Sequence, residues 1–290
     1  MRAMAPGKLV LTGAYAVLEG APAIVAAVDR YAFAEAARDA PGEPRASEVD
    51  VRALQDAAGR KLGLGSSAAA VVASLGARAL AHGEDLSAPE VRQRIFLAAR
   101  DAHARKHGGG SGVDVAASVH GGVSRYRVDE NGLATIEPVD LPAPVCLAAY
   151  DSGSSMRTSD MLARFDRLRS TSAAGVLSAL RDLAHRASCA IDAADARALI
   201  ACAREFGEAL AALGEVIDAP VVPPRFAELA SLAAREHAAF LPSGAGGGDV
   251  GIWLGLGLPS TAFASRARAL AMHLLPLGID RGGLRPEPSS

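Results

Sequence analysis

The stretch "GRKLGLGSSAAAVVASLGARAL", Gly59–Leu80, decides how this chain folds. Its Gly-Leu-Gly-Ser-Ser core predicts a tight turn, and the apolar residues that follow predict a helix over roughly 66–82. Glycines let the backbone turn sharply and approach a ligand closely. The start of the helix adds unpaired N–H groups and the positive end of a helix dipole, so phosphate is the natural ligand. The alternative is a serine-capped helix that binds nothing.

Two standard phosphate-binding motifs fit this loop poorly. The P-loop pattern GxxxxGK[ST] is absent from the sequence. "GLGSSA" matches the GxGxxA form of the Rossmann fingerprint, and Glu84 and Asp85 follow at about the right distance. The preceding "QDAAGRK" is too polar for a buried parallel strand, however, and the acidic residues follow "AHG" instead of a second strand. A Rossmann oxidoreductase therefore remains a lesser alternative.

The segments on either side of the loop predict a mixed α and β protein. The pattern predicts early strands in the runs 8–18 and 22–37, a helix over 89–107 with Ser87 as its N-cap, a strand over 145–150 and helices between 159 and 213. A proline-containing linker near 140–146 marks a boundary between two domains, 1–143 and 144–290.

The composition excludes several classes of function. The chain has 290 residues, a net charge of −2 and only 4% aromatic residues, which argues against partners such as nucleic acids or a membrane surface. Three cysteines without CxxC spacing fit a reduced compartment, and seven histidines form no HExxH pair. Because "MRAMAPGKL" lacks the apolar run of a signal peptide, we expect a cytoplasmic protein.

Two further glycine-rich loops carry acidic residues. "GGGSGVD" (108–114) places Asp114 just beyond a flexible turn, either as an ordinary helix cap or as a carboxylate presented to a ligand. "SGAGGGD" (243–249) has five Gly or Ala residues in a row, which is costly in backbone entropy unless an anionic ligand approaches closely. Together the three loops indicate a phosphate-rich site built from distant segments.

The order of these loops resembles a known family. "APGKLVLTGAYAVLEG", "GLGSSAAA" and "SGAGGGDVGI" resemble the three motifs of the GHMP kinase superfamily, and the likeness covers essentially the whole chain. "GRKLGLGSS" and "GSGVDVAASVHGG" are most similar to the phosphomevalonate kinase branch. The resemblance implies an α+β fold of two domains, the first like domain 2 of ribosomal protein S5 and the second ferredoxin-like. It also implies ATP-dependent phosphorylation of 5-phosphomevalonate, with Mg²⁺ as cofactor, by a monomer or homodimer.

The resemblance also assigns residues to roles. It implies catalytic roles for Lys8 and Asp114, and Mg²⁺ ligation by Ser67. It implies that ATP contacts Gly63, Leu64, Gly65, Ser66, Ser67 and Ala68. It implies that the acceptor contacts Lys61, Ser111, Gly112, Ser155, Arg157, Gly244, Gly246 and Gly247.

The chemistry of the acceptor decides what Asp114 does. A phosphate monoester is largely a dianion at neutral pH, so Asp114 would mainly orient Lys8 or the substrate. An alcohol would need Asp114 to accept its proton.

Two positions depart from the family pattern. Ala14 stands where the family usually has Glu, and His103 stands where mevalonate kinases have an acidic residue. A kinase for mevalonate or another small alcohol, and a degenerate family member that binds without catalysis, therefore remain alternatives. A diphosphomevalonate decarboxylase is disfavoured by the intact "GLGSS" that follows Lys61.

Overall fold

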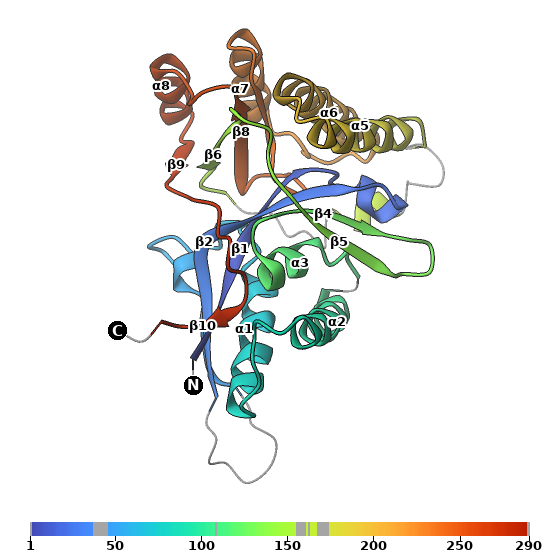
Figure 1. Ribbon diagram of the computed structural model, residues 1–290. Coiled ribbons are helices and arrows are strands. Elements are labelled where there is room, and N and C mark those ends of the chain that lie inside the picture. The colour runs from blue at the N-terminus through green and yellow to red at the C-terminus, as the bar shows by residue number, and fades with distance from the viewer. Residues whose placement is uncertain are drawn as a thin grey trace. The chain divides into compact units, whose positions relative to one another are not determined.

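The computed structural model describes residues 2–36, 46–107, 109–154, 161, 163–166 and 174–288 (Figure 1). The strands are β1 (Arg2–Thr12), β2 (Ala23–Ala36), β3 (Ala46–Asp50), β4 (Val123–Val128), β5 (Ala134–Val139), β6 (Cys146–Asp151), β7 (Ala239–Pro242), β8 (Val250–Gly255), β9 (His273–Leu275) and β10 (Arg285–Pro286). The helices are η1 (Ala16–Glu19), η2 (Arg52–Leu54), α1 (Ser66–Ala81), α2 (Pro89–His107), α3 (Val113–His120), α5 (Ala174–Asp192), α6 (Ala196–Val216), α7 (Pro224–Arg235) and α8 (Thr261–Ala269).

The chain divides into two compact units. Unit 1 comprises Met1–Leu9, Val25–Ser124 and Gly278–Ser290, and unit 2 comprises Val10–Ile24 and Arg125–Leu277. Residues 140–145 connect β5 to β6. The division into domains 1–143 and 144–290 stays a prediction.

The larger sheet contains the N-terminal strand and has the order β10-β1-β2-β4-β5, with β3 also paired to β2. Within unit 1, β10 runs antiparallel to β1 through the pairs Ala3↔Pro286 and Met4↔Arg285. Every residue of β1 is buried except the exposed Arg2 and the half-buried Lys8. A lysine in a strand of this kind is unusual, because Lys is among the residues least often buried.

Helices α1, α2 and α3 of unit 1 pack against one another, and α1 also contacts β3 and β10 (Figure 1). The small residues of α1 allow this close packing. Ala68, Ala69, Ala73 and Ala77 are fully buried. A side chain at Gly76 would lie 2.6 Å from the Leu284 Cδ1 atom, so the C-terminal segment approaches the helix backbone directly.

The segment after residue 277 is fastened to unit 1 by the carboxylate of Asp280, which is 5% exposed. Its Oδ2 atom accepts hydrogen bonds from the Tyr31 hydroxyl at 2.8 Å and from Arg285 Nη2 at 2.8 Å. Its Oδ1 atom accepts from the backbone N–H of Gly283 at 2.7 Å. A buried carboxylate is tolerated when its oxygens are satisfied in this way.

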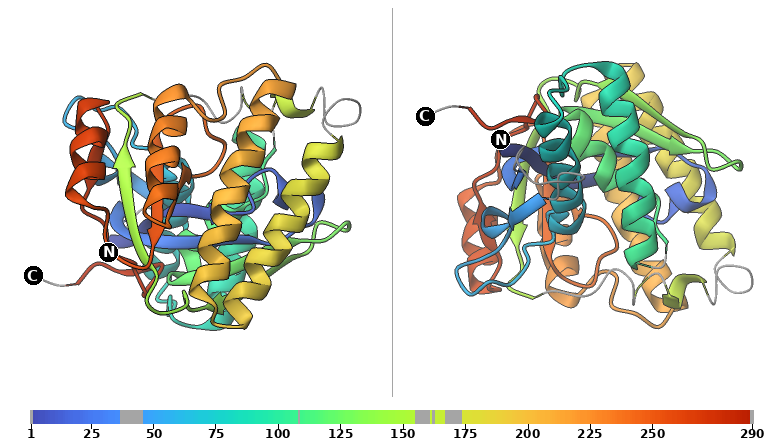
Figure 2. Two further views of the ribbon diagram at one scale, coloured as in Figure 1. Left: turned by 90° about the horizontal axis from the view of Figure 1, so that it is seen from above. Right: turned by 90° about the horizontal axis from the view of Figure 1, so that it is seen from below.

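Unit 2 is built on the four-stranded sheet β7-β8-β6-β9. β8 pairs antiparallel with β6 from Cys146↔Gly255 to Asp151↔Val250, and β7 pairs with β8. Helices α5 and α6 lie side by side as an antiparallel pair, and α6 contacts β7 and β8 (Figure 2). The residues of α6 that face this core recur every three or four positions, as an amphipathic helix requires; they include Leu199, Cys202, Phe206, Leu210 and Leu213.

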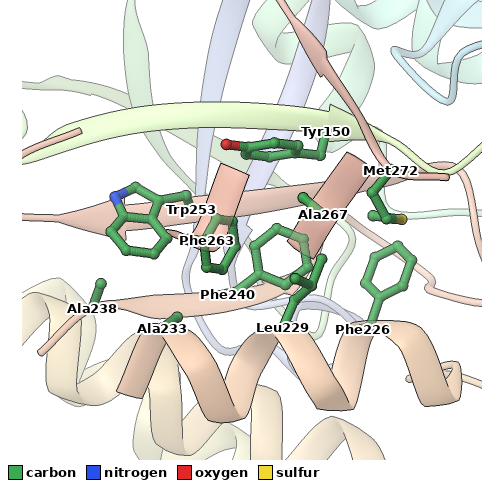
Figure 3. Close-up of a cluster of buried hydrophobic side chains, with 10 residues drawn as sticks. All are labelled: Tyr150, Phe226, Leu229, Ala233, Ala238, Phe240, Trp253, Phe263, Ala267 and Met272. Carbon is green, nitrogen blue, oxygen red and sulfur yellow. The ribbon is translucent and has the colours of Figure 1, made fainter. Parts of the chain in front are cut away.

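An aromatic cluster fills the space between the sheet of unit 2 and its helices α7 and α8 (Figure 3). The ring centroids of Trp253 and Phe263 lie 4.7 Å apart in an edge-on arrangement, and Tyr150 meets Phe240 edge-on at 6.0 Å. Such contacts stabilise a core beyond the area that they bury. The chain has few aromatic residues, and unit 2 concentrates several of them here.

The structure confirms the strand predicted over 22–37 and the helices over 66–82 and 89–107. The strand predicted over 8–18 is correct only for its first part. β1 ends at Thr12, Gly13 has φ of 88°, and Ala16–Glu19 form the 3-10 helix η1. The prediction of Ser87 as an N-cap is wrong. Helix α2 begins at Pro89, and the Ser87 hydroxyl donates instead to the carboxylate of Asp85 at 2.8 Å. Among the described residues, none of the helices combines the length and hydrophobicity that a membrane crossing requires.

Candidate active site

The first glycine loop connects a short hairpin to the start of α1. An antiparallel bridge joins Gln55 to Lys61, and the Leu62 N–H donates to the Leu54 carbonyl at 3.1 Å. The side chain of Lys61 is exposed on this hairpin. Gly63 lies two residues further along, so Lys61 stands at the edge of the glycine loop. Its predicted contact with the acceptor stays a prediction.

Helix α1 begins at a glycine. Gly65 is its N-cap with φ of 76°, a left-handed conformation that L-residues rarely adopt. Because glycine has no side chain, it cannot accept a hydrogen bond from the first-turn N–H groups, as a Ser or Asp cap would. Ser66 is 7% exposed, and Ser67 is half-buried in the same turn. The start of α1 can therefore receive an anionic ligand.

Lys8 is fixed on this loop by its backbone and by its side chain. Its N–H donates to the Leu64 carbonyl at 2.9 Å, and its Nζ atom donates to the Gly63 carbonyl at 3.3 Å. Lys8 is the half-buried exception in the strand β1. Its position next to a helix N-terminus adds a full positive charge to the partial charge of the helix dipole.

Asp114 reaches the same place from a third segment. A Cβ atom at Gly65 would lie 2.9 Å from Lys8 Cγ and 3.7 Å from Asp114 Cβ. The loop residue Gly65 therefore lies between the aliphatic part of Lys8 and the first turn of α3. The structure brings together three predicted segments that are about 50 residues apart along the chain.

Helix α3 repeats the arrangement of α1. Its N-cap is Gly112 with φ of 85°, and Asp114 lies in its first turn. The Ser111 hydroxyl accepts a weak hydrogen bond from the Val113 N–H at 3.4 Å. Further along α3, the Ser118 hydroxyl donates to the Pro6 carbonyl at 2.8 Å, which fastens this helix to the strand that carries Lys8.

His103 of α2 lies close to the carboxylate of Asp114. Its Nε2 atom lies 3.9 Å from Asp114 Oδ2, and the two side chains are 15% and 23% exposed. A protonated imidazole at this distance would attract the carboxylate. In the sequence, His103 is notable only because it departs from a family pattern. The structure shows that it lies beside Asp114.

The third glycine loop belongs to unit 2. Gly244, Gly246 and Gly247 have φ values of 94°, 78° and 82°. A Cβ atom at Gly246 would lie 2.2 Å from the Val221 carbonyl oxygen, so this position accepts only glycine. The Tyr15 hydroxyl donates to the Ala245 carbonyl at 2.6 Å and holds the loop from one side. Burial raises the pKa of Tyr15, so it remains a donor.

The remaining predicted site residues, Ser155 and Arg157, lie outside the described residues. Sequence analysis missed two side chains near the third loop, Tyr15 and Arg225. Tyr15 has φ of 60°, and a side chain in a left-handed conformation could not be read from the sequence. Arg225 lies in the first turn of α7, where the helix dipole disfavours a cation, and that mismatch was a readable signal.

The side chains at this site could hold Mg²⁺ only together with the phosphate groups of a bound substrate. Among the described residues, no group of three or more His, Cys, Asp or Glu side chains is placed to hold a metal ion. Mg²⁺ usually takes one or two protein oxygens, several waters and the phosphates of the substrate. The Ser67 hydroxyl, in the first turn of α1, is an oxygen of the required kind.

Comparisons with known proteins find similarity to GHMP kinases. Residues 28–122 match the family model described as "GHMP kinases N terminal domain". The chain is 30% identical over 204 residues to a mevalonate kinase of Aeropyrum pernix, covering 56% of this chain and 60% of that protein. It is 31% identical over 219 residues to a phosphomevalonate kinase of Streptomyces sp. strain CL190, covering 68% of this chain and 58% of that protein. The matches thus span about three fifths of the length of either curated relative.

A solved structure extends the likeness over the whole chain. Phosphomevalonate kinase of Streptococcus pneumoniae, in complex with phosphomevalonate and AMPPNP, superposes with a TM-score of 0.78 at 19% identity. The match covers 96% of this chain and 99% of that one. At this identity the likeness shows the fold, and the predicted α+β kinase fold is confirmed.

Proposed function

Because this chain belongs to the GHMP kinase superfamily, we propose that it transfers the γ-phosphoryl group of ATP to 5-phosphomevalonate and forms 5-diphosphomevalonate. The observation that carries the proposal is the meeting of three segments around Gly65. A glycine-capped helix start, the ammonium-bearing Lys8 and the carboxylate-bearing Asp114 gather there. Phosphoryl transfer uses this combination of backbone donors, positive charge and a positioned carboxylate.

The nucleotide part of the proposal rests on the start of α1. Residues 63–68 present a glycine turn, first-turn N–H groups and two serine hydroxyls. The triphosphate of ATP is held there by backbone donors and by the helix dipole. Ser67 is the residue that holds Mg²⁺, and the ion when bound neutralises charge on the phosphate oxygens.

Lys8 acts on the phosphoryl group that is transferred. In the loose transition state, negative charge spreads over the three equatorial oxygens of that group, and a fixed ammonium stabilises this charge. The Gly63 carbonyl and the Leu64 carbonyl fix Lys8 before substrate arrives. Positioning of this kind lowers the barrier because little reorganisation remains for the reaction itself.

The acceptor sets the role of Asp114. The phosphate oxygen of 5-phosphomevalonate attacks the γ-phosphorus, the bond from that phosphorus to the β-phosphate oxygen breaks, and ADP leaves. The attacking phosphate is largely a dianion, so it gives up no proton. Asp114 then orients its neighbours. Assignment of Lys61, Ser111, Gly112, Ser155, Arg157, Gly244, Gly246 and Gly247 to the acceptor stays a prediction.

A second candidate acceptor is mevalonate, and the relative from Aeropyrum pernix supports it. Mevalonate offers an alcohol, whose proton must leave as the new bond forms. Asp114 lies beside Lys8 and has His103 at 3.9 Å, so a carboxylate base with a neighbouring imidazole is available. The two acceptors therefore make different demands on the same carboxylate.

Release of ADP in the presence of ATP and Mg²⁺ tests the proposal. The acceptor panel is 5-phosphomevalonate, mevalonate, homoserine and galactose. We expect turnover on 5-phosphomevalonate, a kcat about 100- to 1000-fold lower in Lys8→Met, and no change in the exposed control Lys106→Met. We expect Asp114→Asn to lower kcat by only about tenfold on a phosphate acceptor and by far more on an alcohol. Turnover on mevalonate alone would move the assignment to the second candidate.

A further inference from the structure

Arg225 is a half-buried cation beside the third glycine loop of unit 2. It lies in the first turn of α7, and its Nη2 atom donates to the Ser154 hydroxyl at 2.6 Å. A guanidinium carries five N–H donors in a planar fork, and a neutral hydroxyl engages one of them. The other N–H groups of the Arg225 guanidinium do not bond to Ser154.

The partner of Arg225 belongs to a turn rich in hydroxyl groups. The Ser152 and Ser154 hydroxyls lie 3.1 Å apart, and the Ser152 hydroxyl accepts from the Ser154 N–H at 3.3 Å. Two backbone hydrogen bonds join this turn to the third loop, Asp249 N–H to the Ser154 carbonyl at 2.9 Å and Ser152 N–H to the Asp249 carbonyl at 2.8 Å. The guanidinium and both hydroxyls thus form one cluster.

The glycine loop lies against the same turn. A Cβ atom at Gly248 would be 2.7 Å from the Ser154 hydroxyl oxygen, and φ of Gly248 is 139°. Only glycine therefore fits at this position, and its backbone packs closely against the Ser154 hydroxyl. The cluster combines one positive group, two hydroxyls and a glycine backbone.

The charge on Arg225 lacks a counter-charge in the part of the chain that the structure describes. Three other half-buried arginines, Arg60, Arg125 and Arg285, lie 3.0, 2.9 and 2.8 Å from carboxylates. Arg92 is also half-buried, and it donates to the carbonyls of Leu86 and Gly282 at 3.0 Å. No carboxylate of the described residues comes within ion-pair distance of Arg225. The first turn of a helix also disfavours a cation, so helix stability does not account for this residue. A partly buried charge without a partner is costly unless an anion joins it.

We propose that Arg225, together with Ser152 and Ser154, binds the phosphate-monoester group of the acceptor. A guanidinium fork matches two oxygens of a phosphate, and hydroxyl donors match the third. The choice of ligand rests on the proposed function, whereas the presence of an anion site rests on the cluster alone. Nothing in the sequence motifs assigned a role to Arg225.

This assignment makes Arg225 a determinant of specificity. A site that holds a dianion with a guanidinium loses much of its binding energy with an acceptor that lacks the group, because the charge then stays unpaired. Arg225 therefore favours a phosphorylated acceptor over the corresponding alcohol. Its effect is expected on binding of the acceptor and not on binding of ATP.

The test compares Arg225→Gln and Arg225→Lys with Arg235→Gln, which removes an exposed arginine from the last turn of the same helix. Steady-state kinetics give KM for 5-phosphomevalonate and for ATP, and calorimetric titration measures binding of 5-phosphomevalonate and of inorganic phosphate without nucleotide. We expect Arg225→Gln to raise KM and Kd for 5-phosphomevalonate about 10- to 100-fold. We expect a smaller rise in Arg225→Lys, and no change in KM for ATP or in Arg235→Gln.

The possible outcomes separate this inference from the proposed function. If the protein phosphorylates 5-phosphomevalonate and Arg225→Gln leaves its KM and Kd unchanged, the inference is overturned and the proposed function stands. If 5-phosphomevalonate is not a substrate but inorganic phosphate binds and the binding is lost in Arg225→Gln, the anion site stands and the acceptor is wrong. If phosphate binding is the same in Arg225→Gln and Arg235→Gln, the site is refuted whatever the substrate. Thermal unfolding of each variant controls for misfolding.

Discussion

Two pairs of helices in this chain begin in opposite ways. Helices α6 and α8 of unit 2 begin at Asp195 and Ser260, whose side-chain oxygens accept from the N–H groups of Ala198 at 2.9 Å and Phe263 at 3.1 Å. Helices α1 and α3 of unit 1 begin at Gly65 and Gly112, which have no side chain to offer. In the first pair the cap side chain accepts from one N–H of the first turn. In the second pair the cap residue cannot do so, and at α3 the Ser111 hydroxyl accepts only a long hydrogen bond from the Val113 N–H at 3.4 Å.

The two kinds of helix start differ in whether the cap residue stabilises the helix. Relative to a Ser or Asp cap, a glycine cap costs a helix about a few tenths of a kcal/mol, and α1 and α3 forgo this stability. Both glycine caps are left-handed, so they turn the chain sharply into the helix. Lys8 and Asp114 lie at these two glycine-capped starts. The forgone stability is thus located where the proposed reaction needs backbone donors.

The largest effect is expected from Gly65→Ala. The new methyl group would lie 2.9 Å from Lys8 Cγ. The backbone at this position has φ of 76°, a conformation in which alanine is strained. Displacement of Lys8 or of the loop lowers kcat about 100- to 1000-fold, as measured by ADP release. The matched control is Gly59→Ala, with φ of 80° and nothing within 4 Å of the added Cβ. Equal activity in both variants would contradict the close approach described here.

A smaller loss is expected from Gly112→Ala at the start of α3. Its φ is 85°, so alanine strains the turn by about 1 kcal/mol and shifts the first helical residues, among them Asp114. We expect kcat/KM to fall about tenfold. Gly132→Ala, in the β4–β5 turn with φ of 76° and open space, carries the same strain and should retain full activity. If Gly132→Ala is equally impaired, strain alone explains the loss.

The opposite result is expected at a side-chain cap. Asp195→Ala removes the acceptor for the Ala198 N–H and costs about 1 kcal/mol, a fall in Tm of about 2–4 °C by calorimetry. Activity should not change. Asp195→Asn keeps an acceptor and should restore most of the stability. If Asp195→Ala folds normally but loses activity, the side-chain cap also contributes to function, and the contrast between the two kinds of helix start is wrong.

The smallest effect is expected at the far end of α3. Burial, and then the charge of Arg92, lower the pKa of His120 in the folded chain. The unfolded chain then binds more protons below pH 6.5, so stability is fully present above that pH and falls as the pH drops through it. We expect the free energy of unfolding, measured with urea, to differ less between pH 7.5 and pH 5.5 in His120→Gln than in the unmodified protein. An unchanged difference would contradict the role of burial.

Local patterns predicted most of what decides the fold. The continuous apolar runs predicted β2 and the second half of β1, and the glycine turn with the apolar residues after it predicted α1 within one residue of its observed end. These features depend on neighbours along the chain, which a single sequence displays. Ser87 is no cap because α2 begins at Pro89, two residues further along the chain.

Long-range pairings were beyond such reasoning. Nothing local in the sequence connects Asp280 to Tyr31, or His103 to Asp114, because these pairs form only when helices and strands pack. The sequence predicted the candidate site as three motifs in a given order. That the three motifs form one site was implied by their resemblance to a known family. The structure adds the distances around Gly65 that a motif cannot give.

The last strand of the larger sheet has a consequence for how the protein is made. Leu284 packs on Gly76, and Asp280 binds Tyr31, so unit 1 is complete only when residues after 277 arrive. A ribosome delivers them more than 150 residues after Ser124, on the order of ten seconds later. Residues 125–277 of unit 2 have all been synthesised by then. Unit 1 therefore begins synthesis first and is completed last, and its unfinished alanine-rich face is what a chaperone would meet on the nascent chain.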